Sequence, residues 1–206
     1  MPSGEIPPIV IQRLPLYLRA LSGLESEGEI TSQELGRRVG ISSAQIRKDL
    51  SYFGGFGKQG AGYEVGRLRE KLRQILKVDR EWEVVVVGVG ALGHAIARYA
   101  GFNNRGFRVV AAFDKDPRVI GERVGEVVVQ DVAHMVNVIK RLKAKVAIVA
   151  VPTSQAQEVA DALVRAGVRA ILNYAPTNLN VPDGVRVRHI DPVAGLQSMT
   201  YYLDSE

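Results

Sequence analysis

Apolar positions in the first part of the chain recur at the period of an α-helix. Residues 9–24 carry an apolar side chain every three or four positions, which predicts an amphipathic helix. The residues of this stripe are Val10, Leu14, Leu18 and Leu21. Pro15 lies inside it and is expected to kink or interrupt the helix, because proline has no amide hydrogen to donate. A similar stripe over residues 67–79 predicts a further amphipathic helix.

Two short helices with polar caps are predicted between these stripes. Thr31 or Ser32 can cap the first helix, and Gly40 can end it in a tight turn. Ser42 or Ser43 can cap the second. Two short helices joined by a three- or four-residue turn around a glycine are typical of a helix-turn-helix. A pair of ordinary solvated helices is the alternative.

A glycine-rich stretch, residues 54–65, follows the two helices. Aromatic side chains are interleaved with its glycines, which predicts a small β-hairpin with Lys58 at its tip. Such a wing beside a helix-turn-helix can enter the minor groove of DNA or follow its backbone. A flexible glycine-rich linker is the alternative.

After residue 80 the pattern changes to apolar strands that alternate with helical stretches. The predicted strands are 84–88, 108–113, 126–130, 146–151, 170–173 and 185–190, and the main predicted helices are 91–100, 134–143, 153–166 and 192–203. This alternation predicts an α/β fold with a parallel sheet covered on both faces. We therefore expect a winged helix-turn-helix domain over 1–80, a Rossmann-type doubly wound domain over 81–191 and a C-terminal helix over 192–206.

The first predicted strand of the second domain runs into a glycine turn. Gly88, Gly90 and Gly93 form the spacing G-x-G-x-x-G after a strand and before a helix, which is the fingerprint of a dinucleotide site. Asp114 ends the next strand, where a carboxylate would bind the ribose hydroxyls and favour NAD over NADP. Lys115 is close enough to weaken that preference. A Rossmann-like sheet that binds nothing and a coenzyme A site are the alternatives.

Charge agrees with a polyanion as partner of the first domain once it is joined to the helix-turn-helix pattern. Residues 37–80 contain 11 basic and 4 acidic side chains, which is the electrostatic footprint of a nucleic-acid binder. A solvated positive face is the alternative, and charge alone favours it. On the second helix of the pair, Arg47 is placed to bind a guanine and Gln45 an adenine, while Lys48 is expected at phosphate. The residues that we expect to contact DNA are Ser42, Ser43, Gln45, Arg47, Lys48, Ser51, Tyr52, Lys58 and Gly60.

Candidate catalytic chemistry is sparse. The chain has no cysteine, which excludes disulfides and thiol chemistry and fits a cytoplasmic protein. His94, His134 and His189 lack an evident carboxylate partner, and the nucleotide fold leaves no room for a substrate domain. We therefore expect no catalytic residue, no metal site and no membrane association. An NAD-dependent oxidoreductase with a basic N-terminal extension is the competing hypothesis.

Several runs of the sequence resemble the Rex family of redox-sensing transcriptional repressors. These runs are RLPLYLRAL (13–21), SSAQIRKDLSYFGGFGKQGAGY (42–63), VGVGALGHAIA (87–97), FDKDP (113–117) and ILNYAPTNLNVP (171–182). The resemblance implies a homodimer that binds a palindromic double-stranded operator with NAD⁺ or without ligand and is released by NADH.

The resemblance also implies roles for individual residues. The last helix would cross to the partner subunit, and Arg19, Tyr99 and Asp191 would couple the nucleotide to the DNA-binding domain. A helix that packs on its own sheet and a half-buried aromatic at Tyr99 are the alternatives. The residues expected to contact NAD⁺ or NADH are Gly88, Val89, Gly90, Ala91, Leu92, Gly93, Tyr99, Asp114, Lys115, Val151, Pro152 and Asn173.

Overall fold

The computed structural model describes residues 6–56 and 62–203. By its internal contacts the chain divides into two compact units, Met1–Arg80 and Glu81–Glu206. Each unit has a hydrophobic core of its own. Lys58 and Gly60, two of the residues expected at DNA, lie outside the described residues.

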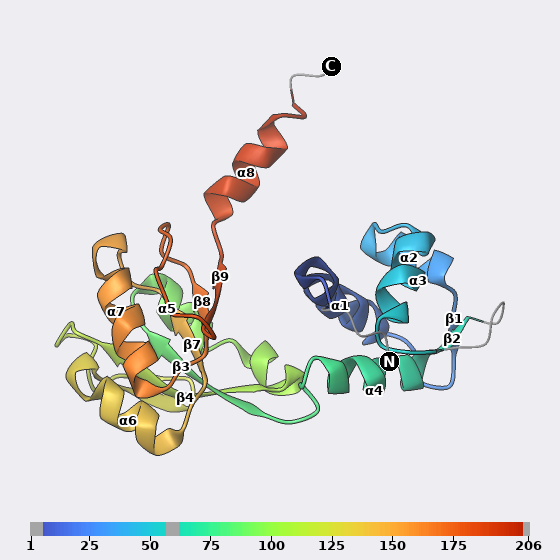
Figure 1. Ribbon diagram of the computed structural model, residues 1–206. Helices are drawn as coiled ribbons and strands as arrows, with labels where there is room; N and C mark the ends of the chain where they lie inside the picture. Colours follow the sequence, from blue (N-terminus) through green and yellow to red (C-terminus); the bar gives the residue numbers. More distant parts are fainter. Residues whose placement is uncertain (1–5, 57–61, 204–206) are drawn as a thin grey trace. The chain divides into compact units, whose positions relative to one another are not determined.

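The first unit contains four helices and a two-stranded sheet among its described residues. In chain order these are α1 (Pro8–Leu21), β1 (Glu29–Ile30), α2 (Ser32–Val39), α3 (Ser43–Ser51), β2 (Tyr63–Glu64) and α4 (Val65–Ile75) (Figure 1). Leu14, Ile46 and Leu72, on three different helices, are fully buried or nearly so in its core. Tyr17 is buried there too, in place of Leu18, which is only partly buried.

The turn between α2 and α3 forms through local capping. Thr31 Oγ1 accepts a hydrogen bond from the amide of Glu34 at 3.1 Å, and Ser42 Oγ accepts one from the amide of Gln45 at 3.2 Å. Gly40 ends α2 with a φ of 70°, which glycine adopts without a steric penalty. The polar caps and the glycine thus fix both ends of the helix-turn-helix.

Of the two effects predicted at Pro15, a kink or an interruption of the helix, the interruption does not occur. The helix is continuous from Pro8 to Leu21. Pro15 and Ile11 are both exposed, so the carbonyl of Ile11, which has lost its helical donor, can bind water instead. The interruption was a wrong expectation because the proline lies on the solvated side of the helix.

Among the described residues, the strand that ends the glycine-rich stretch pairs with a segment before the helix-turn-helix. Tyr63 lies opposite Ile30 and Glu64 opposite Glu29 in an antiparallel ladder, so β2 pairs with β1. The hairpin predicted over 54–65 falls partly on residues 57–61, outside the described residues. A strand of two residues has too few ladder bonds to predict its partner from local sequence. The pairing places the glycine-rich segment between the end of α3 and the start of α4.

The second unit is built on a seven-stranded sheet. Its strands are β3 (Trp82–Val87), β4 (Phe107–Asp114), β5 (Arg123–Val124), β6 (Val127–Asp131), β7 (Val146–Val149), β8 (Ala170–Asn173) and β9 (Arg186–His189). The strand order is β5-β6-β4-β3-β7-β8-β9, and only β5 runs antiparallel to its neighbour. Without β5, the order is that of a Rossmann fold.

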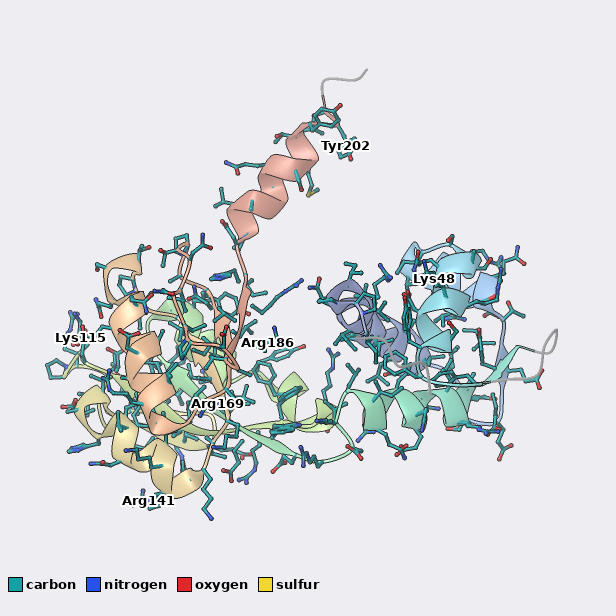
Figure 2. All side chains as sticks on the ribbon, in the orientation of Figure 1. Lys48, Lys115, Arg141, Arg169, Arg186 and Tyr202 are labelled. Atoms are coloured by element: carbon teal, nitrogen blue, oxygen red, sulfur yellow. The ribbon has the colours of Figure 1, made fainter. Side chains whose placement is uncertain are left out.

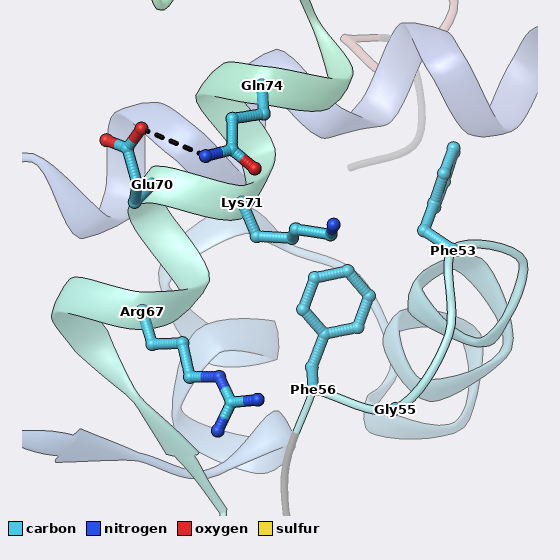
Figure 3. Close-up of a pocket in the computed structure, with 7 residues that line it drawn as sticks. All are labelled: Phe53, Gly55, Phe56, Arg67, Glu70, Lys71 and Gln74. Atoms are coloured by element: carbon cyan, nitrogen blue, oxygen red, sulfur yellow. Dashed lines mark hydrogen bonds between the residues drawn. The ribbon is translucent and has the colours of Figure 1, made fainter.

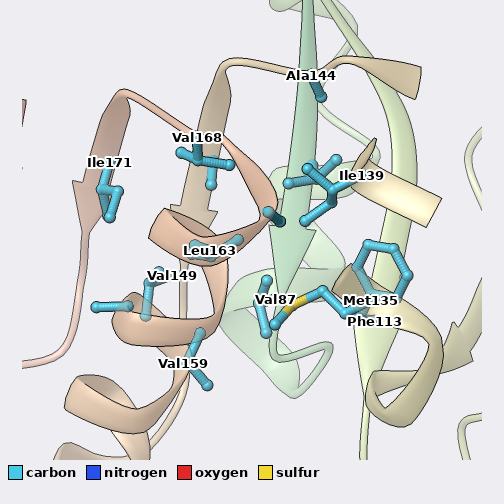
Figure 4. Close-up of a cluster of buried hydrophobic side chains, with 14 of the residues drawn as sticks. Val87, Phe113, Met135, Ile139, Ala144, Val149, Val159, Leu163, Val168 and Ile171 are labelled. Atoms are coloured by element: carbon cyan, nitrogen blue, oxygen red, sulfur yellow. The ribbon is translucent and has the colours of Figure 1, made fainter. Parts of the chain in front are cut away.

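Helices cover both faces of this sheet. They are α5 (Ala91–Ala97), α6 (Met135–Leu142) and α7 (Thr153–Ala166), with short 3-10 segments at Ala100–Arg105 and Val132–His134. Successive residues of β3 point to opposite faces. Val85 and Val87 pack with α6 and α7 in one cluster (Figure 4), while Val84 and Val86 pack with α5 in the other.

The last helix, α8 (Pro192–Thr200), extends away from the sheet of the second unit (Figure 1), and all of its residues are exposed. Val193, Leu196 and Met199 lie at helical spacing and are 59%, 62% and 63% exposed. A stripe of large apolar side chains in water is unfavourable for an isolated helix and typical of an interaction surface. None of the described helices is long and apolar enough to cross a membrane.

Candidate functional site

A cavity of about 870 Å³ lies at the carboxyl ends of the central strands of the second unit. It begins at Gly88, directly after β3, and extends to the ends of β4 and β7 at Asp114 and Ala150. The chain connects β3 to neighbours on opposite sides, β4 and β7. A crevice at such a reversal of strand order is where open α/β sheets bind their ligands.

The three glycines of the fingerprint have separate roles. Gly88 has a φ of 89°, and a Cβ there would come within 2.5 Å of the carbonyl oxygen of Ala150. A Cβ on Gly93 would overlap the carbonyl oxygen of Gly88, so this glycine allows α5 to pack against the turn. Gly90 has open space at its Cβ position and lines the cavity. Two glycines therefore shape the turn, and the third leaves room for a ligand.

The carboxylate of Asp114 joins the glycine turn to the loop after β4. Its Oδ2 accepts a hydrogen bond from the amide of Val89 at 2.6 Å, and its Oδ1 accepts one from the amide of Asp116 at 2.9 Å. Each carboxylate oxygen can accept a second hydrogen bond. Asp114 lines the cavity, so its remaining acceptor capacity is available to hydroxyl groups of a ligand.

An exposed ion pair forms the outer edge of the same loop. Arg118 donates from Nε to Asp116 Oδ1 at 3.0 Å and from Nη2 to Oδ2 at 2.6 Å. The Arg118 side chain and its backbone amide hold the pKa of Asp116 at about 2. Both residues line the cavity, and the pairing offsets the positive charge of Arg118 on this loop.

Seven of the residues expected at the nucleotide line the cavity: Gly88, Val89, Gly90, Asp114, Lys115, Val151 and Pro152. Five do not: Ala91, Leu92, Gly93, Tyr99 and Asn173. Ala91, Leu92 and Gly93 belong to the first turn of α5, where Gly93 is buried under the glycine turn while Leu92 is 48% exposed. Tyr99 follows α5, is 54% exposed and contacts Phe102 edge to face.

Asn173 has a local structural role at the end of β8. It is fully buried. Its Nδ2 donates to the carbonyls of Ala175 and Thr177, each at 3.0 Å, and lies 3.2 Å from His189 Nδ1. Its Oδ1 accepts from the amide of Ala175. The side chain thus stabilises the loop after β8, and its contact with the nucleotide stays a prediction.

Sequence reasoning missed the helix residues that line the cavity. Gln155 and Glu158 of α7 face it, together with Met135 and Val136 of α6. The signal was present, because α7 begins shortly after β7 and its first turns must lie beside the carboxyl end of that strand. The apolar spacing of α7 alone does not separate its cavity side from its solvent side.

The helix α3 carries most of the described residues expected at DNA. Lys48 projects from it and is exposed (Figure 2). Arg47 is also exposed, and its Nη1 donates to Ser32 Oγ at the start of α2 at 2.9 Å. Ser42 caps the helix, Ser43 starts it, and Ser51 donates to the carbonyl of Lys48. Tyr52 follows as the C-cap.

A buried carboxylate on α3 was not anticipated. Asp49 is fully buried and accepts hydrogen bonds from Arg13 Nε and Nη2 and from Tyr17 Oη, all at 2.6 Å, and from Gln45 Nε2 at 2.7 Å. Burial alone would raise the pKa of Asp49, but these donors, Arg13 first, hold it below its ordinary value. Burial and the bond to Asp49 raise the pKa of Tyr17.

A smaller cleft of about 450 Å³ lies between α4 and the segment after α3 (Figure 3). Phe53 and Phe56 lie on one side of it, and Arg67 and Lys71 extend into it from α4. Phe56 is 9% exposed and packs in the core of the unit with Leu68 and Leu72. This contact anchors the first part of the glycine-rich stretch to the core of the unit.

Three residues were expected to couple nucleotide binding to DNA binding, and each lies at or next to the end of a helix. Arg19 is exposed in the last turn of α1. Tyr99 precedes the 3-10 segment after α5. Asp191 caps α8, with Oδ1 accepting from the amides of Val193 and Ala194 at 2.9 and 3.2 Å. Each is accessible, as a contact with a second subunit requires.

Two family models match the chain. The one described as CoA binding domain matches residues 79–177, and the one described as putative DNA-binding protein N-terminus matches residues 5–51. The first match spans the cavity and the second spans α1 to α3.

Curated proteins described as redox-sensing transcriptional repressor Rex are similar over nearly the whole chain. The protein of Chloroflexus aggregans is 57% identical over 206 residues, 99% of this chain and 97% of that protein. The protein of Streptomyces coelicolor is 43% identical and covers 97% of this chain, which spans 78% of that protein.

Two solved structures of a Rex-family repressor, RSP, are also similar to this chain in fold and in sequence. A crystal structure of RSP in complex with β-NAD⁺ and operator DNA has a TM-score of 0.91 and 39% identity, covering 98% of this chain and 94% of that one. RSP in complex with β-NADH has a TM-score of 0.88 and 37% identity, with coverage of 98% and 96%.

Proposed function

The chain belongs to the Rex family of redox-sensing transcriptional repressors, and we propose that it binds a palindromic operator through α3 and releases it when NADH occupies the cavity of the second unit. The observation that carries this proposal is that one chain combines a capped helix-turn-helix with a dinucleotide cavity. A protein that must report nucleotide state to DNA needs both.

The cavity fits NAD⁺ or NADH. The glycine turn leaves open space at Gly90 for the pyrophosphate, and Asp114 has acceptor capacity for the ribose hydroxyls. Lys115, Val151 and Pro152 complete the site that we assign to the nucleotide. When bound, the nicotinamide is cationic in NAD⁺ and neutral in NADH, and this difference in charge is what a redox sensor must detect.

Release of DNA by NADH requires two states with different affinities. Nucleotide and DNA must affect each other's binding by the same factor, because coupling between sites is reciprocal. We propose that Arg19 of one subunit and Asp191 of the other form an ion pair that is made in one state and broken in the other. We propose that Tyr99 responds to the nicotinamide of the bound nucleotide. All three side chains are exposed.

A homodimer supplies the symmetry of a palindromic operator. Each subunit would place one α3 in a major groove, with half-sites one or more helical turns apart. The exposed apolar side of α8 is the surface that we assign to the partner subunit. Because its operator is cellular DNA, we place the protein in the cytoplasm.

The relatives are transcriptional repressors and not enzymes. The competing hypothesis of an NAD-dependent oxidoreductase therefore has no support from them. The His189 ring lies beside Asn173 at 3.2 Å and not at the cavity. We propose no catalytic residue for this chain.

Binding of the purified protein to a labelled palindromic DNA, at one salt concentration, tests the proposed function. Titration with NADH is expected to release the DNA, and excess NAD⁺ is expected to restore binding. DNA binding that does not respond to either nucleotide would reduce the cavity to a structural site. Absence of any DNA binding would contradict the assignment of α3.

A further inference from the structure

Asp49 accepts hydrogen bonds from three side chains, at 2.6 and 2.7 Å. Two oxygens accept four donors: Oδ1 accepts from Arg13 Nη2 and Gln45 Nε2, and Oδ2 accepts from Arg13 Nε and Tyr17 Oη. A carboxylate has about four acceptor positions, so Asp49 is saturated. Three of the donors come from α1 and link it to α3. The fourth, from Gln45, lies on the helix that faces DNA in the proposed function.

We propose that Asp49 is a positioning residue for operator reading, which fixes the carboxamide of Gln45 in one orientation. This inference rests on the proposed function. A carboxylate can only accept, so the Nε2 end of Gln45 must face Asp49 and the amide cannot turn over. Gln45 and Asp49 are four residues apart and therefore lie on the same side of α3.

The fixed orientation leaves a defined pair of groups on Gln45. Among the described residues, no side chain or backbone amide donates to Oε1 of Gln45, and Gln45 is partly exposed. Oε1 is therefore available as an acceptor, and Nε2 keeps one hydrogen that Asp49 does not use. An acceptor beside a donor matches adenine in the major groove, which offers the N6 amino donor beside the N7 acceptor.

The same orientation opposes guanine. Guanine presents two acceptors, O6 and N7, so Oε1 of a fixed Gln45 would face an acceptor. A freely turning amide could direct Nε2 at guanine and avoid this repulsion. Asp49 therefore increases the preference for adenine over guanine, because it prevents the Gln45 amide from turning over to accommodate guanine. It also reduces the conformational entropy that Gln45 loses on binding DNA, because the side chain is already fixed.

The test compares base preferences of full-length variants. The wild-type protein first selects operators from a random DNA library, and every base pair of the selected half-site is then substituted in turn. We expect one adenine at which substitution by guanine weakens binding roughly 5- to 100-fold, the usual range for a bidentate pair. Gln45→Ala should abolish the adenine-over-guanine preference at that position only.

Asp49→Asn tests the positioning itself. Asparagine can offer Gln45 either an acceptor or a donor, so the amide can turn over. We expect the adenine-over-guanine ratio at the same position to fall below about threefold, mainly because the guanine operator binds better, with other positions unchanged. Tyr17→Phe removes a different donor to Asp49 and keeps the bond to Gln45, so it should lower stability and leave the ratio as in the wild type.

If circular dichroism shows that Asp49→Asn does not fold, operators that contain base analogues are tested with the wild-type protein instead. Replacing the adenine by 7-deazaadenine removes N7, and replacing it by purine removes the N6 amino group, and both should weaken binding. An unchanged ratio in Asp49→Asn, or no effect of either analogue, overturns the positioning role. Loss of all sequence preference in the wild type would instead contradict the proposed function.

Discussion

The carboxylate of Asp114 accepts a hydrogen bond from the backbone amide of Val89, with 2.6 Å between Oδ2 and the nitrogen. The two residues belong to different strand ends and are 25 positions apart. Because the other carboxylate oxygen is bonded to the amide of Asp116, one side chain joins the glycine turn to the loop after β4. Asp114 therefore holds two edges of the cavity together.

Asp114→Ala should weaken NADH binding roughly 10- to 100-fold, since a hydrogen bond to a charged group contributes about 1.5–3 kcal/mol. The variant loses the acceptor for ribose and also frees the amide of Val89. Isothermal titration calorimetry measures the change. Asp161→Ala, on the exposed side of α7, is the matched control and should bind NADH as the wild type does. Equal affinities of wild type and Asp114→Ala would remove Asp114 from the site.

Two glycine variants should separate folding from binding. Gly93→Ala places a methyl group against the carbonyl of Gly88, and such overpacking costs about 1–3 kcal/mol of stability. Gly90→Ala has open space around its Cβ, so the melting temperature should not fall, while NADH affinity should. Differential scanning calorimetry and NADH titration on both variants check this. A Gly90→Ala protein with normal affinity would place the pyrophosphate elsewhere.

The Arg13–Asp49 pair predicts an acid limit to stability. The pKa of Asp49 lies below its ordinary value of 3.8, so its contribution is fully present above about pH 4 and is lost as the pH falls through the lower folded-state value. Asp49→Asn should lower the unfolding free energy at pH 7 by up to about 3–5 kcal/mol. Its stability should then change less than that of the wild type between pH 4 and 2.

Thermal unfolding followed by circular dichroism over this pH range is the measurement. Tyr17→Phe keeps the carboxylate and its bond to Arg13, so its acid limit should resemble that of the wild type. Parallel acid profiles of wild type and Asp49→Asn would show that other carboxylates set the limit.

The parts of the fold that the sequence predicted are those determined by neighbouring residues. The turn at Gly88 and the caps at Thr31 and Ser42 depend on residues within a few positions of each other. The central strands of the large sheet were predictable because both of its faces are buried there, so β3, β4 and β7 are nearly continuous apolar runs. The two-residue edge strand β5 has no such run and was not predicted.

The parts that the sequence did not predict depend on distant partners. Arg13 and Asp49 are 36 positions apart, and neither has a local pattern that marks it as buried. The hydrogen bonds of the Asn173 amide with the loop that follows β8 were likewise not predictable from neighbouring residues. A chain position can be predicted to lie near a site without showing which groups its side chain will bind.

Leu196→Asp should convert the protein from a dimer to a monomer, because it places a charge in the middle of the exposed apolar stripe of α8. Leu196 is 62% exposed, so the stability of the isolated subunit should be nearly unchanged. A palindromic operator should bind this variant much more weakly than the wild type, since two subunits held together gain from the proximity of the second half-site.

Analytical ultracentrifugation measures the change in mass, and Gln197→Asp is the matched control. It introduces the same charge one residue further along the same helix, outside the apolar stripe, and should remain a dimer. A dimeric Leu196→Asp protein would show that subunits associate through another surface. In that case the exposed side of α8 would need a different partner, and the proposed route from Asp191 to Arg19 of the other subunit would lose its basis.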